Sequence, residues 1–302
     1  MQGVLRKQPF YFYLGLALIA AMATCIVLGL APVTTWATPV LWSGLILICD
    51  AVLFVRTRHS VLRNGAIIPL AVISLCGWWM FEWFNIFLSN WHYLNLTEPL
   101  PLRYLGYLWS FATITPGILL VYGVLNSFIK KVPGPQFSVS KGLLAFMFLI
   151  GLLFIAAPII PVSMYYANRA ADRELFVFLH WAANTYYAEY TAAFVWTGFV
   201  LLLEPLNYSM GNPSILREMT EGKYKPLALL ALAGAVCGLL WEFWNYWAHT
   251  KWCYTVPILG HIKIFEMPVL GYLGFIPFAW ELYAIVSLVY PRAIRIVEPD
   301  QS

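Results

Sequence analysis

Long uncharged apolar stretches are the feature that most limits what this chain can fold into. Residues 10–30 and 142–160 contain no Asp, Glu, Lys or Arg, and each is close to the roughly 20 residues that cross a bilayer core as a helix. Lipid offers no partner to bare backbone groups, so such segments must be helical. The composition agrees, because only 11% of the 302 residues are charged, against about a quarter in soluble domains. The sequence therefore predicts an all-α, polytopic membrane protein.

The apolar stretches predict about eight transmembrane helices. The first is too long, and lacks the small-residue cleavage site, to be a removed signal peptide. The predicted spans are residues 10–31, 39–55, 65–89, 103–128, 140–160, 174–204, 225–249 and 268–290.

The distribution of Lys and Arg predicts the orientation. With a cytoplasmic N-terminus, thirteen basic residues fall in cytoplasmic segments and five in outer ones, which is the positive-inside pattern. We therefore expect a multi-pass protein of the cytoplasmic (inner) membrane with both termini in the cytoplasm. The net charge of +4 arises from this asymmetry. No basic patch suggests a nucleic-acid partner.

The two halves of the chain share a series of short motifs. "WSGLILICD" at 42–50 precedes "SVLR" at 60–63, as "WTGFVLLLE" at 196–204 precedes "SILR" at 214–217. The halves then share "FEWFN" and "WEFWN", "NWHY" and "KWCY", and "EPLPLRYLGY" and "EMPVLGYLGF". We expect a four-helix repeat at 1–130, a linker at 131–138 and a second four-helix repeat at 139–302. Four spans is an even number, so the copies enter the membrane in the same sense, in the parallel arrangement.

Polar residues at helical spacing mark the ends of the third and seventh spans. Glu242 and Asn245 share one stripe at i and i+3, and Glu82 and Asn85 repeat it in the first half. A carboxylate in lipid costs several kcal/mol unless it is paired, protonated or faces a cavity, so it is a candidate for function. Pairing with Arg103 or Lys251, or packing between helices, is the structural alternative.

The second half carries polar groups that the first half lacks. His180, Asn184 and Glu189 lie in an apolar stretch, and Glu281 aligns with Thr113. Such one-sided polarity is expected when only one copy of a duplicated scaffold keeps a working site. The candidate catalytic residues are Glu82, Asn85, Glu242, Asn245, Glu266 and Glu281.

We expect no cofactor and no metal. The five cysteines form no CxxC pair. Phosphate-binding and dinucleotide-binding fingerprints are absent. A weaker alternative is a zinc site, formed from Glu242, His249, His261 and Glu266.

The order of the motifs resembles the membrane-bound lycopene cyclase family, the small heterodimeric or fused type. The stretches that carry the resemblance are "SILR", "WEF", "KWCY" and "FEMPVLGY" in the second half and "SVLR", "FEW", "NWHY" and "EPLPLRY" in the first. They cover about 50 to 70 residues of each half in a tandem arrangement that fused family members also have. The sequence departs from the family's Pro-x-Glu-Glu motif, because Val269 and Leu270 follow Pro268 and the acid, Glu266, precedes it. It also has four predicted spans per repeat where the family has three.

The resemblance implies an enzyme that protonates a lipid-soluble, isoprenoid- or carotenoid-like polyene, so that a carbocation closes a ring. Glu242 would be the acid, and Glu266 or Glu281 the base. Aromatic faces stabilise a nearby cation by roughly 2 kcal/mol or more when desolvated. The candidate substrate-binding residues are Trp241, Trp244, Tyr246, Trp247, Trp252, Tyr254, His180 and Glu189.

Two other classes of function remain open. A transporter or lipid carrier would bind its substrate near the midplane between the halves. A structural subunit would turn its aromatic residues toward a membrane complex and pair all its acids. Besides substrate, the expected partners are membrane lipids and either a second copy of the chain or such a complex.

Overall fold

Helices make up most of the structure. The computed structural model describes residues 7–160 and 187–299. Its α-helices are α1 (Phe10–Val27), α2 (Ala31–Thr34), α3 (Ala37–Thr57), α4 (Ile67–Leu88), α5 (Leu100–Ala112), α6 (Ile114–Phe128), α7 (Lys141–Ala156), α10 (Ala192–Met210), α11 (Ile215–Thr220), α12 (Lys225–Trp247), α13 (Phe275–Val289) and α14 (Pro291–Val297). Two 3₁₀ helices, η1 (Tyr187–Tyr190) and η2 (Val269–Gly274), precede α10 and α13.

Six helical stretches in the described part of the chain are long and apolar enough to cross a membrane. They are α1, α3, α4, α5 with α6, α12, and η2 with α13. The all-α, multi-pass class is therefore supported. α7 is apolar but shorter than a full span. The predicted span at 174–204 lies partly outside the described residues, and within the described part its helix, α10, begins at Ala192. The count of eight spans stays a prediction.

Four short strands lie where the sequence analysis expected loops. β1 (Trp91–Leu94) pairs antiparallel with β2 (Lys251–Tyr254), and β3 (Lys263–Ile264) pairs with β4 (Met267–Pro268). The pairing of β1 with β2 joins segments that follow α4 and α12, so it ties the two halves of the chain together. Four-residue strands are too short to show a clear period of two in a sequence.

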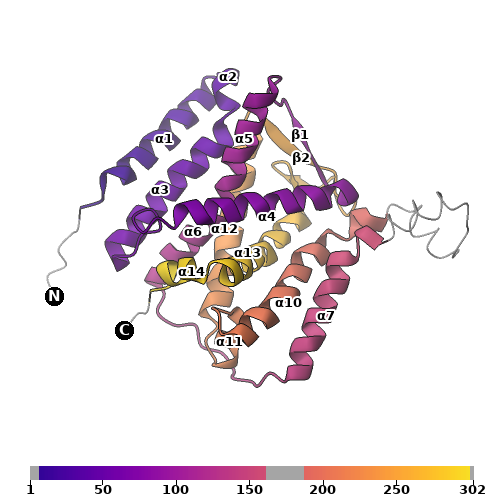
Figure 1. The fold of residues 1–302 in the computed structure, drawn as a ribbon. Helices are drawn as coiled ribbons and strands as arrows, with labels where there is room; N and C mark the ends of the chain where they lie inside the picture. Colours follow the sequence, from indigo (N-terminus) through magenta and orange to yellow (C-terminus); the bar gives the residue numbers. More distant parts are fainter. Residues whose placement is uncertain (1–6, 161–186, 300–302) are drawn as a thin grey trace, which may run out of the picture.

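Each half packs its first helix on its second through a close glycine contact. A Cβ on Gly15 of α1 would lie 2.6 Å from the carbonyl oxygen of Gly44 in α3. A Cβ on Gly151 of α7 would lie 2.9 Å from the carbonyl oxygen of Gly198 in α10. Small residues let membrane helices approach closely. In the view of Figure 1, the α1–α3 pair and the α7–α10 pair lie on opposite sides of the bundle.

A buried carboxylate near the end of α3 and another in α10 hold the loops that follow. Asp50 accepts hydrogen bonds from Ser60 Oγ at 2.6 Å and from a backbone amide of the same loop. Glu204 accepts them from Ser214 Oγ at 2.8 Å and likewise from a loop amide. Buried polar groups of this kind are costly unless hydrogen-bonded. These two acids therefore fix loop conformation.

Aromatic rings fill the space between the halves. Trp241 of α12 lies edge-on to Trp42 of α3, with ring centroids 5.5 Å apart, and its ring is 5.6 Å from that of Trp78 in α4. Phe81 of α4 lies 4.7 Å from Trp196 of α10. These contacts place an aromatic core directly beneath the β1–β2 pair.

Candidate functional site

The two predicted asparagines fasten the strands to the helix ends. Asn85 donates from Nδ2 to the Trp91 carbonyl at 2.8 Å and accepts from the Asn90 amide at 2.9 Å. Asn245 donates to the Trp252 carbonyl at 2.8 Å and accepts from the Trp252 amide at 2.9 Å. Both side chains thus satisfy backbone groups that would otherwise be unpaired. Asn85 and Asn245 therefore act as structural anchors that hold the strand segments next to the two glutamates.

Glu82 lies within a shell of hydrogen-bond donors. Its Oε1 accepts from Trp78 Nε1 at 2.9 Å, from Trp91 Nε1 at 3.1 Å and from the Tyr93 hydroxyl at 2.5 Å. The residue is partly exposed.

Glu242 is held differently, although it occupies the matching position on α12. It is fully buried. Its Oε1 accepts from the Tyr254 hydroxyl at 2.8 Å and from Trp252 Nε1 at 3.4 Å, and its Oε2 has no hydrogen-bond partner among the described residues. Burial, together with the nearby Glu242 and the hydrogen bond to it, raises the pKa of Tyr254 well above its usual value, so this phenol stays protonated as the donor.

Apart from Trp78 of α4, the donors to both glutamates come from one face of the β1–β2 pair. Alternate residues of a strand share a face, which places Trp91 and Tyr93 of β1 together with Trp252 and Tyr254 of β2. Trp91 pairs with Tyr254, and Tyr93 pairs with Trp252. Exchanging the halves leaves this pattern unchanged, because each Trp faces the other strand's Tyr. The two glutamate sites are therefore related by an approximate two-fold relation that passes through the sheet.

A cavity of about 540 Å³ lies against this aromatic face. Its volume falls in the range of roughly 300–1,000 Å³ that small-molecule sites occupy. Both halves contribute to its wall, at matching positions: Trp42 and Trp196, Trp91 and Trp252, and Tyr93 and Tyr254. Neither Glu82 nor Glu242 is among the lining residues. The carboxyl groups instead lie behind the tyrosines whose hydroxyls they bind.

The structure brings four of the predicted substrate-binding residues to the cavity. Trp241, Trp252, Tyr254 and Glu189 all line it. His180 lies outside the described residues.

The other three predicted aromatic residues do not line the cavity. Trp244 is buried against Trp42, with ring centroids 5.4 Å apart. Trp247 is 52% exposed and Tyr246 40% exposed, and the Lys251 ammonium lies 5.3 Å from the Tyr246 ring centroid. Asn245 points into the bundle, so Tyr246 and Trp247, one and two positions further along the helix, point away from it.

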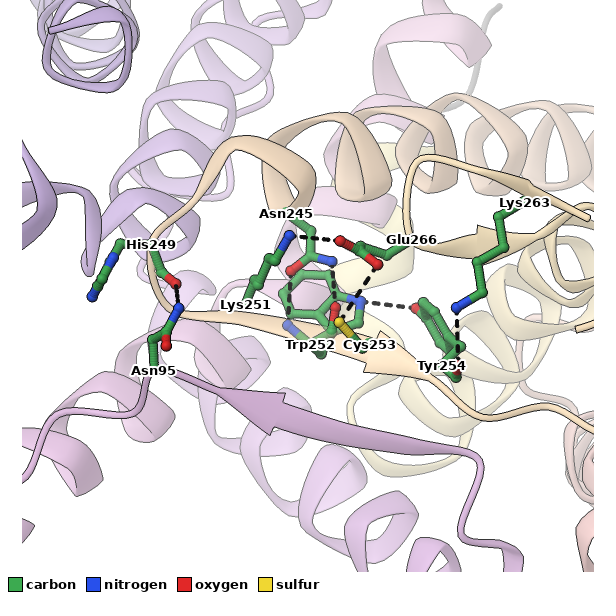
Figure 2. A network of polar contacts seen from close by, with 9 residues as sticks. All are labelled: Asn95, Asn245, His249, Lys251, Trp252, Cys253, Tyr254, Lys263 and Glu266. Atoms are coloured by element: carbon green, nitrogen blue, oxygen red, sulfur yellow. Dashed lines mark hydrogen bonds and ion pairs between the residues drawn. The ribbon is translucent and has the colours of Figure 1, made fainter. Parts of the chain in front are cut away.

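Glu266 is paired with a basic neighbour. Lys251 Nζ lies 2.6 Å from its Oε1, and the Cys253 thiol lies 3.5 Å from its Oε2. Figure 2 shows this network, with Lys263 bonded to the Tyr254 carbonyl at its edge. Burial alone would raise the pKa of Glu266, but the bound Lys251 outweighs it and holds that pKa below its usual value. Glu266 is therefore an ionised partner in an ion pair.

Glu281 is isolated. It is fully buried in α13, and neither carboxyl oxygen has a hydrogen-bond partner among the described residues. It is not one of the residues that line the cavity. The structure thus separates it from the two glutamate sites.

The alternative zinc site is not assembled. No three His, Cys, Asp or Glu side chains gather to hold a metal ion in the described ranges, which include Glu242, His249, His261 and Glu266.

Three site residues were missed by the sequence analysis, although "NWHY" was recognised as a repeated motif. Trp78, Trp91 and Tyr93 bind Glu82 and line the cavity. The signal that could have found them is the alternation of Trp and Tyr in "WHY" and "WCY", which places both rings on one strand face.

Comparison with known proteins returned no relative. No family model matches the chain, and neither a curated protein nor a solved structure matches it.

Proposed function

We propose that this chain is an integral membrane enzyme that binds a lipid-soluble, isoprenoid-like substrate in the aromatic cavity and protonates it. The observation that carries the proposal is Glu242, a buried carboxyl group whose hydrogen-bonded partner, Tyr254, lines the cavity. In this scheme Tyr254 donates a proton to the substrate while it accepts one from Glu242. A hydrogen-bonded relay of this kind suits general acid catalysis.

The surroundings of Glu242 favour the neutral acid. The residue is fully buried, has an unbonded Oε2 and takes part in none of the ion pairs of the described residues. An ionised carboxylate in such a place would pay a large desolvation cost. The proton is therefore retained until a substrate accepts it.

The cavity wall suits the cation that protonation of a carbon–carbon double bond creates. Indole and phenol faces attract a cation without reacting with it, by roughly 2 kcal/mol or more when desolvated. Trp42, Trp196 and Trp241 supply such faces from both halves. The apolar wall also excludes water, which would otherwise capture the cation.

Glu82 is placed to complete the reaction. Its Oε1 accepts hydrogen bonds from three donors, and one of these, the Tyr93 hydroxyl, belongs to a residue that lines the cavity. In the scheme, a carbon next to the cation loses a proton to Glu82 through Tyr93, so the product is an isomer of the substrate. Glu82 is partly exposed and loses its proton to solvent. After the product leaves, water that enters the cavity returns a proton to Glu242 through Tyr254. This role replaces Glu266, which is paired with Lys251, and Glu281, whose carboxyl oxygens accept no hydrogen bond from a cavity-lining residue among the described residues.

The architecture that fits the proposal is a tandem repeat of four spans, with eight spans in all and both termini cytoplasmic. The matched glycine contacts, the matched loop caps and the two-fold pattern of β1 and β2 support it. The repeat boundaries remain those expected at 1–130 and 139–302. The resemblance to membrane lycopene cyclases is part of the same proposal and adds ring closure as the reaction type.

A transporter is the second candidate, and one observation favours it. The cavity is lined by matching residues of both halves, which is where parallel repeats place a transported substrate. A transporter would move its ligand unchanged, whereas the proposed enzyme adds a solvent-derived proton to it.

Deuterium incorporation tests the proposal. The purified protein in lipid nanodiscs is incubated in D₂O with a panel of acyclic isoprenoids of increasing length, and products are analysed by mass spectrometry. We expect one deuterium per turnover, and a loss of roughly 10²–10⁴-fold in rate for Glu242→Gln. Glu266→Gln is the matched control and keeps the rate within about tenfold. Undiminished deuterium incorporation by Glu242→Gln would refute the role of this residue.

A further inference from the structure

The arginine side chain of Arg103 lines the largely apolar cavity. Arg103 lies in the first turn of α5, is half-buried and forms part of the cavity wall. Its Nε donates to the Thr97 carbonyl at 2.8 Å, which fixes the guanidinium group at the wall. A charged residue in a membrane span is costly and commonly marks a binding site.

Arg103 has no acidic partner in the described part of the chain. The ion pairs there join Lys223 to Glu218 and to Glu221, and Lys251 to Glu266. Lys251 also lines the cavity, but Glu266 already occupies its ammonium group at 2.6 Å. Glu189 lines the cavity as well and takes part in none of these pairs.

The position of Arg103 within its helix adds to the positive potential. The N-terminus of a helix carries a partial positive charge, so a cation in the first turn is unfavourable unless an anion lies nearby. The first turn of α5 contains no acidic residue. Two sources of positive potential, the guanidinium and the helix end, therefore act at the wall of the cavity, and no acidic side chain of the described residues forms an ion pair with Arg103.

We infer that the ligand of the cavity is amphipathic, with a single anionic head group, a phosphate or a carboxylate, that binds Arg103. This inference rests on the proposed function and names its substrate class. A guanidinium forms paired hydrogen bonds with either anion, and the apolar chain replaces water along the aromatic wall.

The head group fixes the direction in which the chain enters. Tyr107, one turn after Arg103, lines the cavity, and its ring lies 5.7 Å from that of Tyr93, the donor to Glu82. In the register of the shared motifs, Gly271 occupies the place of Arg103 in the second half. The anionic head group of the ligand therefore binds at Arg103 and has no equivalent site in the second half. The apolar chain of the ligand extends from Arg103 over Tyr107 and Tyr93.

Ligand binding, measured without turnover, tests the inference. The protein is placed in nanodiscs of zwitterionic lipid and titrated with farnesyl phosphate, farnesol or inorganic phosphate. Binding is followed by the fluorescence of the tryptophans that line the cavity. We expect farnesyl phosphate to bind roughly tenfold to a hundredfold more tightly than farnesol. We also expect inorganic phosphate to bind too weakly to compete.

Matched variants separate the head-group contact from general attraction to a basic surface. Arg103→Gln is expected to bind farnesyl phosphate and farnesol equally, and Arg103→Lys to recover part of the preference. Lys263→Gln removes an exposed cation outside the cavity. This variant should keep the full preference for farnesyl phosphate over farnesol.

Three results would overturn the inference: equal affinity of the native chain for the phosphate and the alcohol, a preference that survives Arg103→Gln, or competition by inorganic phosphate at equal concentration. Each is independent of the proposed reaction. Glu242→Gln is expected to keep the binding preference while it loses deuterium incorporation. If the native chain binds farnesyl phosphate more tightly than farnesol but incorporates no deuterium, the proposed reaction is wrong and the inferred ligand class stands.

Discussion

The sites around Glu82 and Glu242 are built on the same scaffold and hold their carboxyl groups differently. Glu82 accepts three hydrogen bonds on one oxygen and is partly exposed. Glu242 is fully buried. Its Oε1 accepts a short hydrogen bond from Tyr254 and a long one from Trp252, and its Oε2 has no hydrogen-bond partner among the described residues. The residue that makes the difference is Trp78, whose indole donates to Glu82, because Gly238 stands four residues before Glu242.

This difference teaches how a doubled scaffold can supply both an acid and a base. Two carboxyl groups in unlike surroundings hold their protons with unlike strength, and such pairs divide acid and base roles. The strands that bind them are equivalent, so in the proposed scheme the division of acid and base roles rests on the Trp78 indole and on the difference in exposure. Variants made in matched pairs therefore test the comparison most directly.

The largest difference is expected between Tyr254→Phe and Tyr93→Phe. Removing the Tyr254 hydroxyl breaks the only hydrogen bond among the described residues that joins Glu242 to a hydroxyl group of the cavity wall, so turnover should fall by about 10²–10³-fold. Removing the Tyr93 hydroxyl leaves Glu82 two donors, and we expect a loss of about tenfold. Initial rates of deuterium incorporation measure both. Equal losses would show that the two sites do not divide the roles as proposed.

The next largest effect is a pH dependence of stability, and it is expected at Glu298, near the C-terminal end of the second half. Glu298 follows α14 and accepts hydrogen bonds from Tyr122 and Tyr283, whereas Lys130, at the matching position in the first half, is exposed. Burial raises the pKa of Glu298 from its ordinary 4.5 to about 7, with the two tyrosine hydrogen bonds opposing it. The folded state thus holds this proton more tightly than the unfolded state does.

The sign of the pH dependence follows from that shift. The stabilisation is complete below the ordinary pKa of 4.5 and is lost as the pH rises through about 7. Over this pH range Glu298 changes the free energy of unfolding by about 3 kcal/mol in total. Glu298→Gln should lack this dependence, and denaturation in detergent between these pH values measures it. A native chain whose stability rises over that range relative to Glu298→Gln would contradict the assignment.

A smaller and symmetrical effect is expected at the anchoring asparagines. Asn85→Ala and Asn245→Ala each leave backbone groups of the β1 or β2 segment unpaired, at a cost of about 2 kcal/mol. The two variants should lose similar stability, because the hydrogen bonds they remove are alike in length. A shift in the midpoint of thermal unfolding measures this. If one variant were unaffected, the halves would not share this anchor.

The smallest effect is expected at the outward-facing end of α12. Trp247→Ala should change stability by less than about 0.5 kcal/mol, since the side chain is 52% exposed, whereas Trp241→Ala should cost about 3–5 kcal/mol because Trp241 is 6% exposed. The same unfolding measurement distinguishes them. Similar losses would place Trp247 against protein, as expected of a subunit interface.

The helices and the paired motifs could be predicted from the sequence, whereas the rotation of each helix could not. Long apolar stretches predicted α1, α3, α4 and α12 to within a few residues, because a helix needs such lengths to cross a bilayer. α12 is apolar nearly all round, so nothing in the stretch showed that Trp241 faces the cavity while Trp247 faces outward.

The strands and the cavity also escaped prediction for physical reasons. β1 and β2 exist because segments about 160 residues apart meet, and four residues carry little periodic signal. Glu266 was expected as a base, but its distance to Lys251 depends on how the loop after β2 folds back. The sequence did predict that a carboxyl group in "WEFWN" requires partners or a cavity, and Glu242 has both a partner and a cavity beyond it.

The most direct test of the central claim is native mass spectrometry of the protein as it is released from its membrane, compared with two variants that fill the cavity. A Cβ on Gly106 would lie 3.9 Å from Trp36, and one on Gly274 would lie 4.0 Å from Trp196, so isoleucine at either position projects into the cavity without a backbone clash. We predict a bound lipid-soluble molecule on the native chain and its loss from Gly106→Ile and Gly274→Ile. Retention of the same molecule by both folded variants would contradict the claim that this cavity is the binding site.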